Sequence, residues 1–134
     1  MENRIDIDRV RAIFNAMGRD TLHLVDELYA PGVVFIDPFH RVEGSNALRE
    51  YYRNMYTNVQ SIRFEFEGEM RGADEVVLYW QMTYRHRRIA GGAPVTVPGC
   101  SRLVFDAAGK VVLHRDYFDA GNLLYEHLPV VGGL

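Results

Sequence analysis

The chain has 134 residues, of which 48% are hydrophobic and 12% aromatic, and this length predicts one domain with a single core. Its formal net charge of −3, from 15 basic and 18 acidic residues, argues against nucleic acid or an anionic membrane surface as a partner. The single cysteine, Cys100, excludes an intramolecular disulfide, and no apolar stretch approaches the roughly 20 residues that span a bilayer. The charged N-terminus also lacks the apolar run of a signal peptide, so we expect a cytoplasmic protein.

The first half of the chain carries helical patterns. Apolar residues recur at helical spacing in three segments, which predict helices over Asp8–Met17, Asp20–Tyr29 and Ser45–Val59. A short apolar run, residues 33–36, stands between the second and third helices and predicts a buried strand.

From Ile62 onward the apolar residues alternate with polar ones, which is the pattern of half-buried strands. The strand that begins at Ile62 is followed by three more, over Glu75–Arg88, Val95–Phe105 and Lys110–Asp119, and then by a short helix over Ala120–His127. Helices followed by a four-stranded antiparallel meander predict an α+β fold with the helices on one side of a curved sheet.

Two groups of polar residues interrupt these strands. Asp37 follows the buried strand, where desolvation prepares a carboxylate for proton transfer, although Asp-Pro also commonly begins a turn. In the last strand, alternation places His114, Asp116 and Phe118 on one face. The five histidines show no paired metal-ligand spacing and no glycine-rich phosphate loop precedes a helix, so we expect neither a metal nor another cofactor.

Several motifs together resemble one superfamily over nearly the whole chain. They are Tyr29-Ala30-Pro31 through Asp37-Pro38-Phe39, Glu43-Gly44 leading into Leu48 and Tyr52, and the turn over residues 105–111. With them the chain resembles the nuclear transport factor 2-like superfamily, which includes ketosteroid isomerase, limonene epoxide hydrolase and the SnoaL-like polyketide cyclases. The resemblance implies a single SnoaL-like domain over residues 1–134. Its fold would be a cystatin-like cone, in which a strongly bent antiparallel sheet wraps around three N-terminal helices.

The resemblance also implies roles for individual residues. Asp37 matches the general base of ketosteroid isomerase-like members, and Asp116 matches the acid/base aspartate of SnoaL-like cyclases, with His114 tuning it. A buried structural pair of His114 and Asp116 is an equally open alternative. The oxyanion donors of ketosteroid isomerase are missing, because Ser101 stands at or next to one of their positions and residues 12–14 occupy the other.

We therefore expect a cofactor-independent acid/base enzyme, of isomerase, cyclase or lyase type, that acts on a small apolar carbonyl-containing molecule. The residues expected to bind that molecule are Phe14, Phe39, Tyr56, Trp80, Met82, Tyr84, Ser101 and Phe118. The alternative is a non-catalytic ligand-binding or dimerisation module of the same fold, which the missing oxyanion donors favour. An epoxide hydrolase ranks below both, because Arg115 faces away from Asp116.

A homodimer is also expected. Its contact would be the outer face of the sheet, where Tyr79, Gln81, Thr83 and Arg85 alternate with the residues of the pocket face.

Overall fold

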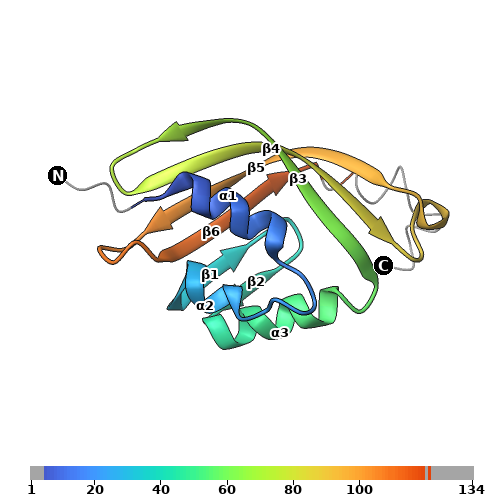
Figure 1. Cartoon of the computed structure of the whole chain (residues 1–134), viewed down its shortest axis with the longest axis horizontal. Helices are drawn as coiled ribbons and strands as arrows, with labels where there is room; N and C mark the ends of the chain where they lie inside the picture. The colour runs from blue at the N-terminus through green and yellow to red at the C-terminus, as the bar shows by residue number, and fades with distance from the viewer. Residues whose placement is uncertain (1–4, 120, 122–134) are drawn as a thin grey trace.

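The computed structural model describes residues 5–119 and 121, which contain three α-helices and one six-stranded sheet (Figure 1). The helices are α1 (Ile7–Ala16), α2 (Leu24–Leu28) and α3 (Ser45–Met55), with a 3₁₀ turn, η1, at Ala90–Gly92. The strands are β1 (Tyr29–Ile36), β2 (Arg41–Glu43), β3 (Val59–Arg71), β4 (Glu75–His86), β5 (Val95–Phe105) and β6 (Val111–Phe118). The α+β class expected from the sequence is confirmed.

The sheet has the order β2-β1-β6-β5-β4-β3 and is mixed rather than wholly antiparallel. Strands β3 to β6 form the expected meander, but β1 pairs in parallel with β6 and antiparallel with β2. The expected second helix is shorter than predicted, since α2 ends at Leu28 and Tyr29 already belongs to β1. The register between β1 and β6 shifts between Tyr29 and Val34, which accommodates Pro31 and Gly32 in the strand.

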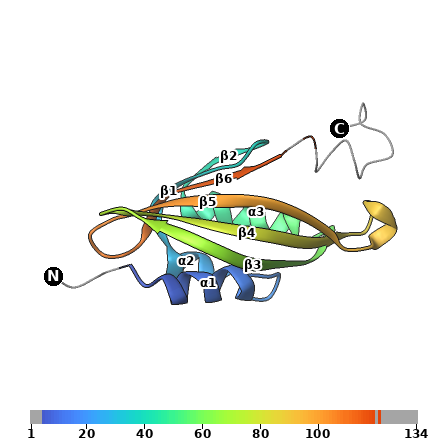
Figure 2. The same ribbon diagram turned by 90° about the horizontal axis from the view of Figure 1, so that it is seen from above.

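The helices lie on the inner side of the bent sheet. In Figure 1 the long strands β3, β4 and β5 arch over α1, while α3 runs along the bottom. Figure 2 shows the same three strands side by side from above. Helix α1 packs on β3, and α3 packs on β1 and β2, so the two helices close opposite sides of the space under the arch.

The buried hydrophobic residues form two clusters, a main core and a smaller one. The largest fully buried side chains include Trp80, Leu48, Leu78 and Leu103, which belong to the main core. A second cluster is formed by Tyr84, Val95 and Val97 towards the end of β4 and the beginning of β5.

Gly99 is the glycine on which the inner face depends. It pairs with Trp80 across β4 and β5, and a Cβ atom at Gly99 would lie 2.5 Å from the Trp80 ring and 2.6 Å from the carbonyl oxygen of Tyr117. Only glycine therefore allows the Trp80 indole to lie against β5. The indole Nε1 then reaches Ser101, two residues further along the strand.

Other differences from the sequence expectations concern the ends of elements. Helix α3 ends at Met55 instead of Val59, because Val59 already pairs with His86 at the beginning of β3. The expected helix over Ala120–His127 lies outside the described residues, apart from position 121. In the part of the chain that the structure describes, no helix is long and apolar enough to cross a membrane.

Candidate functional site

A cavity of about 250 Å³ lies between α1, α3 and the inner face of the sheet. Its apolar wall is formed by Ile13, Phe14, Met17, Leu28, Phe35, Phe39, Met55, Val59, Ile62, Phe64, Met82, Ile89 and Phe118. The polar side chains in the wall are Tyr29, Asp37, His40, Tyr51, Tyr52, Tyr56, Tyr84, His86, His114 and Asp116. An apolar wall with a few convergent polar groups is typical of a small-molecule site, and the volume lies just below the usual range of roughly 300–1,000 Å³.

Asp116 is held from one side by a chain of hydrogen bonds that begins at Trp80. The Trp80 Nε1–H donates to Ser101 Oγ at 2.9 Å, and the Ser101 hydroxyl donates to Asp116 Oδ1 at 2.5 Å. Ser101 and Asp116 are direct partners across β5 and β6, which sets this contact by the register of the sheet. Both Trp80 and Ser101 are buried, so their polar atoms have no access to bulk water.

His114 holds the same carboxylate oxygen from the other side. Its Nε2 lies 2.6 Å from Asp116 Oδ1, and its Nδ1 lies 2.7 Å from the hydroxyl of Tyr29. A carboxylate oxygen only accepts, so His114 donates from Nε2, and its other ring nitrogen, Nδ1, then accepts from the Tyr29 hydroxyl. The Tyr29 hydroxyl lies 3.3 Å from that of Tyr52, which extends the chain to α3.

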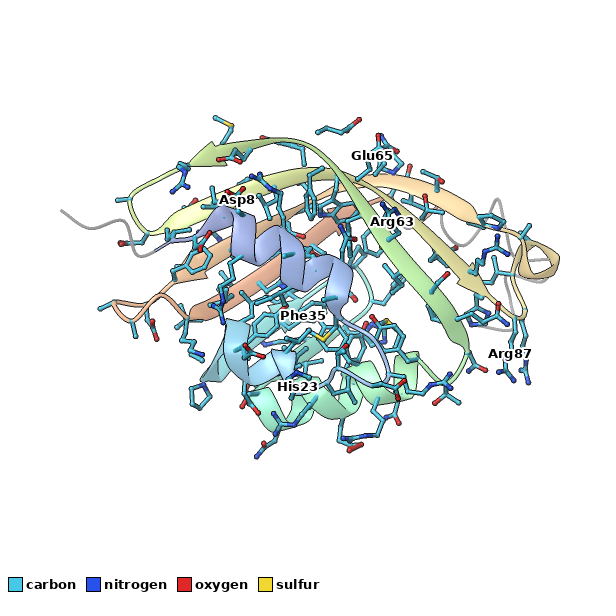
Figure 3. All side chains as sticks on the ribbon, viewed as in Figure 1. Asp8, His23, Phe35, Arg63, Glu65 and Arg87 are labelled. Atoms are coloured by element: carbon cyan, nitrogen blue, oxygen red, sulfur yellow. The ribbon has the colours of Figure 1, made fainter. Side chains whose placement is uncertain are left out.

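Aromatic rings fix the orientation of the His114 imidazole. It stacks on Phe14 with ring centroids 5.5 Å apart and on Tyr29 with centroids 5.8 Å apart, and it meets Phe35 edge to face with centroids 4.8 Å apart. Figure 3 shows Phe35 in the interior, between the sheet and the helices. The His114 side chain is only 4% exposed and therefore has little freedom to turn away from Asp116.

The two hydrogen-bond chains meet at a single atom. Asp116 Oδ1 accepts from both Ser101 and His114, whereas no group among the described residues donates to Asp116 Oδ2. The Asp116 side chain is 18% exposed and lines the cavity. Among the described residues, the carboxylate is thus held through Oδ1 alone.

Asp37 also lines the cavity, but its carboxylate is used by the turn that it begins. Its Oδ1 accepts from the backbone N–H groups of Phe39 at 2.8 Å and His40 at 2.7 Å, and it lies 3.2 Å from His40 Nδ1. Its Oδ2 accepts from the Tyr51 hydroxyl at 2.9 Å. The turn role, which the sequence left open beside proton transfer, is therefore present in the structure.

The sheet register explains why Asp37 and Asp116 share one cavity. Phe35 pairs with His114 and Ile36 with Arg115 in the parallel β1–β6 ladder. Continued by one residue, this register places Asp37 beside Asp116. Because side chains alternate between the two faces of a sheet, both carboxylates lie on the same inner face as Phe35 and His114. Their adjacency depends on a strand pairing between segments about 80 residues apart, which no local pattern indicates.

The structure brings most of the expected site residues to this cavity. Asp37, His114 and Asp116 all line it, as do six of the expected substrate-binding residues: Phe14, Phe39, Tyr56, Met82, Tyr84 and Phe118. Trp80 and Ser101 were expected to touch substrate but are not part of the wall. Both are buried on the inner face, where Ser101 contacts Asp116 and Trp80 contacts Ser101.

The sequence did not assign roles to the tyrosine hydroxyls that surround the two carboxylates. Tyr51 and Tyr52 belong to the apolar stripe of the third predicted helix, which indicated core packing first and left open that one hydroxyl reaches a cavity, and Tyr29 was placed on the apolar face of the second helix. Burial is the main cause of the raised pKa of Tyr29, Tyr51 and Tyr52, and the negative charge of Asp116 adds to it in each case. These hydroxyls therefore stay protonated at neutral pH and remain hydrogen-bond donors.

Metal ligands do not cluster in the described part of the chain. Within residues 5–119 and 121, no three side chains of the His, Cys, Asp and Glu types are grouped so that they could hold a metal ion.

Comparison with solved structures finds the same fold in several bacterial proteins. An NTF2-like protein of unknown function from Burkholderia pseudomallei has a TM-score of 0.78 and 19% identity, over 93% of this chain and 97% of that one. A candidate SnoaL-like polyketide cyclase from Shewanella denitrificans has a TM-score of 0.72 and 17% identity, over 87% and 93% of the two chains. A candidate isomerase of the SnoaL-like family from Agrobacterium tumefaciens has a TM-score of 0.66 and 16% identity, over 85% and 94%.

These identities are low, so the structural matches show the fold alone, which is the NTF2-like α+β cone with an open, mixed sheet. A comparison with curated proteins found no match. The family model for the SnoaL-like domain, in contrast, matches residues 10–114, which include most of α1, the whole of α2 and α3, β1 to β5, and His114. The chain therefore belongs to the SnoaL-like domain family.

Proposed function

We propose that the protein is a cofactor-independent acid/base enzyme that moves a proton next to the carbonyl group of a small apolar molecule. The observation that carries the proposal is the asymmetric binding of Asp116, with two donors on Oδ1 and none from the described residues on Oδ2. A carboxylate held in this way keeps its second oxygen for proton transfer, and it does not have to be reoriented before it reacts. Two of the structural neighbours are named as a candidate polyketide cyclase and a candidate isomerase, which agrees with this class of reaction.

The proposed step begins with removal of a proton from the carbon next to the carbonyl group. Asp116 Oδ2 takes the proton, and the electron pair of the C–H bond moves into the carbonyl to give an enolate. The proton then returns from Asp116, either to the same carbon or to another atom of the enolate. We assign His114 and Ser101 as positioning residues, because each donates a hydrogen bond to Asp116 Oδ1.

The enolate oxygen needs a hydrogen-bond donor, and Tyr52 is the group that we assign to it. Tyr52 lines the cavity, and among the described residues its hydroxyl has one hydrogen-bond partner, the Tyr29 hydroxyl at a long 3.3 Å. Because Tyr29 donates to His114, the proton of the Tyr52 hydroxyl can turn to a ligand oxygen without breaking the chain to Asp116. Its raised pKa keeps that proton in place at neutral pH.

Asp37 has a different role in this proposal. Its carboxylate is already engaged by two backbone N–H groups and by Tyr51, so we assign it to holding the turn and the Tyr51 ring at the cavity wall. Asp116 is then the single proton acceptor of the reaction.

The test uses hydrogen exchange, because it needs no knowledge of the natural substrate. In D₂O the methyl ketone 2-acetyl-6-methoxynaphthalene loses its acetyl protons if a base removes them, and proton NMR follows that loss. General-base catalysis typically contributes about 10²–10⁴-fold, so we expect the wild type to accelerate exchange and Asp116→Asn to lower the acceleration by at least about 100-fold. Asp8→Asn is the matched control, since the Asp8 side chain is 91% exposed, and it keeps the wild-type rate.

The same experiment addresses the alternative of a ligand-binding module. Saturable binding of the ketone with exchange no faster than in buffer would refute the enzyme proposal and favour that alternative.

A homodimer through the outer face of the sheet is proposed separately. Tyr79, Cys100 and Tyr117 stand opposite one another across β4, β5 and β6, and the two tyrosines are 39% and 44% exposed. The two exposed tyrosines on a broad sheet face suit a two-fold contact. Light scattering is expected to give twice the mass of the chain for the wild type and a lower mass for Tyr79→Lys combined with Tyr117→Lys, and a wild-type monomer would refute the proposal.

A further inference from the structure

The cavity wall towards η1 includes Tyr84, whose buried hydroxyl has no partner among the described residues. Tyr84 is 5% exposed and lines the cavity, and its hydroxyl makes no hydrogen bond with any described residue. The ring belongs to the small cluster with Val95 and Val97, against which Ile62, Met82, Ile89 and Phe118 pack. Five of these six neighbours have hydrocarbon side chains, and Met82 offers only a thioether sulfur, which is a weak acceptor.

Such a hydroxyl is unusual because buried polar groups are nearly always paired. A phenylalanine at the same position would fill the same space without a buried donor to satisfy. The other tyrosines in the wall differ from Tyr84 in this respect, as shown by Tyr56, whose hydroxyl donates to the carbonyl oxygen of Met17 at 3.2 Å. An acceptor carried by a molecule in the cavity would complete the hydrogen bonding of Tyr84.

A second donor stands two residues further along the same strand. His86 Nδ1 accepts the backbone N–H of Arg88 at 3.0 Å, which leaves the ring proton on Nε2 of the neutral imidazole. No described residue pairs with Nε2, and the ring lines the cavity. Burial, followed by the charges of Arg88 and Arg87, lowers the pKa of His86, so the ring is neutral at pH 7.

These two donors lie far from the carboxylate of the proposed reaction. Asp116 pairs with Ser101, which pairs with Leu78 on β4, and Tyr84 follows Leu78 by six residues on that strand. Six residues of extended strand cover roughly 20 Å, which the bend of the sheet shortens. Figure 3 places Arg87, the residue after His86, at the far end of the molecule. The cavity is therefore chemically polarised, with carboxylates towards one end and donors towards the other.

We propose that Tyr84, with His86 beside it, forms a binding subsite for an acceptor oxygen at the distal end of an elongated substrate. The substrate class is then an apolar, ring-containing ketone with a second oxygen, such as an ether or a further carbonyl, on the side away from the reacting carbon. This inference rests on the proposed function for the position of the ketone, and it adds the second oxygen. The bulk of the molecule lies against the aromatic wall between the two ends.

The test compares two probes that differ in one atom. The first probe, 2-acetyl-6-methoxynaphthalene, carries an ether oxygen where the second, 2-acetyl-6-ethylnaphthalene, carries a methylene group. Their emission depends on the polarity of their surroundings, so fluorescence titration gives both dissociation constants. One added hydrogen bond predicts that the wild type binds the methoxy probe about threefold to tenfold more tightly.

Two tyrosine variants decide whether Tyr84 is the source of that preference. Tyr84→Phe is expected to remove the preference, so that both probes bind with nearly equal affinity, and to unfold at the same or a higher temperature than the wild type. Tyr79→Phe is the matched control, because Tyr79 is not part of the cavity wall and its hydroxyl contacts Met70 Sδ, and it keeps the preference. Retention of the preference in Tyr84→Phe would overturn the proposal, and so would equal affinities, or no saturable binding of either probe, in the wild type.

The outcome is independent of catalysis. If the methoxy preference depends on Tyr84 but no acetyl protons exchange in the wild type, the subsite stands and the proposed proton transfer fails. If acetyl protons exchange in a way that depends on Asp116 but the wild type shows no methoxy preference, the proposed proton transfer stands and the subsite fails.

Discussion

The buried contact between Trp80 and Ser101 allows a quantitative test of the hydrogen-bond chain behind Asp116. Ser101→Ala removes the acceptor of the Trp80 Nε1–H and one of the two donors to Asp116 Oδ1. An unpaired buried donor costs about 1–3 kcal/mol, and a hydrogen bond to a charged group contributes about 1.5–3 kcal/mol. Since both residues are 1% exposed or less, water cannot replace either partner, and we expect Ser101→Ala to lower the free energy of unfolding by about 3–5 kcal/mol.

A double-mutant cycle isolates the part of this loss that belongs to the indole. Trp80→Phe removes the Nε1–H together with ring volume, and the cost of the lost volume cancels in the cycle. In the Trp80→Phe background, Ser101→Ala leaves no indole N–H without an acceptor. The substitution is therefore expected to cost about 1–2 kcal/mol less than in the wild type.

Urea unfolding at pH 7, followed by circular dichroism, gives the four free energies from midpoints and a shared slope. Circular dichroism is the appropriate probe because the chain has only one tryptophan, which the cycle removes. Additivity of the two substitutions within about 0.5 kcal/mol would refute the contact as an energetically coupled pair.

Three further predictions concern the turn, the inner face of the sheet and alkaline pH. Gly99→Ala is expected to cost about 1–3 kcal/mol and to shift the Trp80 fluorescence, because a Cβ atom there would meet the indole ring at 2.5 Å; an unchanged spectrum and stability would contradict this packing. Asp37→Ala removes the acceptor of two backbone N–H groups and of the Tyr51 hydroxyl, and it is expected to lower the free energy of unfolding in urea by about 2 kcal/mol. Asp37→Asn keeps Oδ1 and is expected to lose less than half of that amount. Equal losses in the two variants would argue against the turn contacts. Burial raises the pKa of Tyr56 to about 12, so the folded chain holds this proton while the unfolded chain releases it near pH 10. The free energy of unfolding therefore falls as pH rises from about 10 to 12. Tyr56→Phe is expected to reduce this pH dependence, and an unchanged pH dependence would refute the assignment.

The sheet meander and the end of the first buried strand were predictable because they depend on local pattern. In β4 the residues Val76, Leu78, Trp80 and Tyr84 are buried at alternate positions, and this is what the alternation predicted. The strand at residues 33–36 ends before Asp37, as the Asp-Pro pair indicated. These features need only the side-chain period of a strand and the restrictions that proline imposes.

The arrangement around Asp116 was less predictable because it depends on contacts distant in sequence. Tyr29 and His114 are 85 residues apart, and they meet only because β1 joins the sheet beside β6 in parallel. Tyr29 was interpreted as the end of a helix, since periodicity does not reveal a strand that begins before Pro31-Gly32. Alternation also placed Trp80 and Ser101 on the inner face, but it does not tell which inner residues reach the cavity. Gly99 decides this, because it leaves room for the indole to lie on the sheet.

The most direct test of the central claim is the rate of acetyl-proton exchange at equal occupancy of the cavity. Fluorescence titration first sets the concentration of 2-acetyl-6-methoxynaphthalene at which the wild type and Asp116→Asn are equally saturated, and NMR in D₂O then gives both exchange rates. The account predicts that exchange in Asp116→Asn is at least about 100-fold slower than in the wild type, because the oxygen that accepts the proton is lost. Equal exchange rates at equal occupancy would contradict the assignment of Asp116 as the proton acceptor.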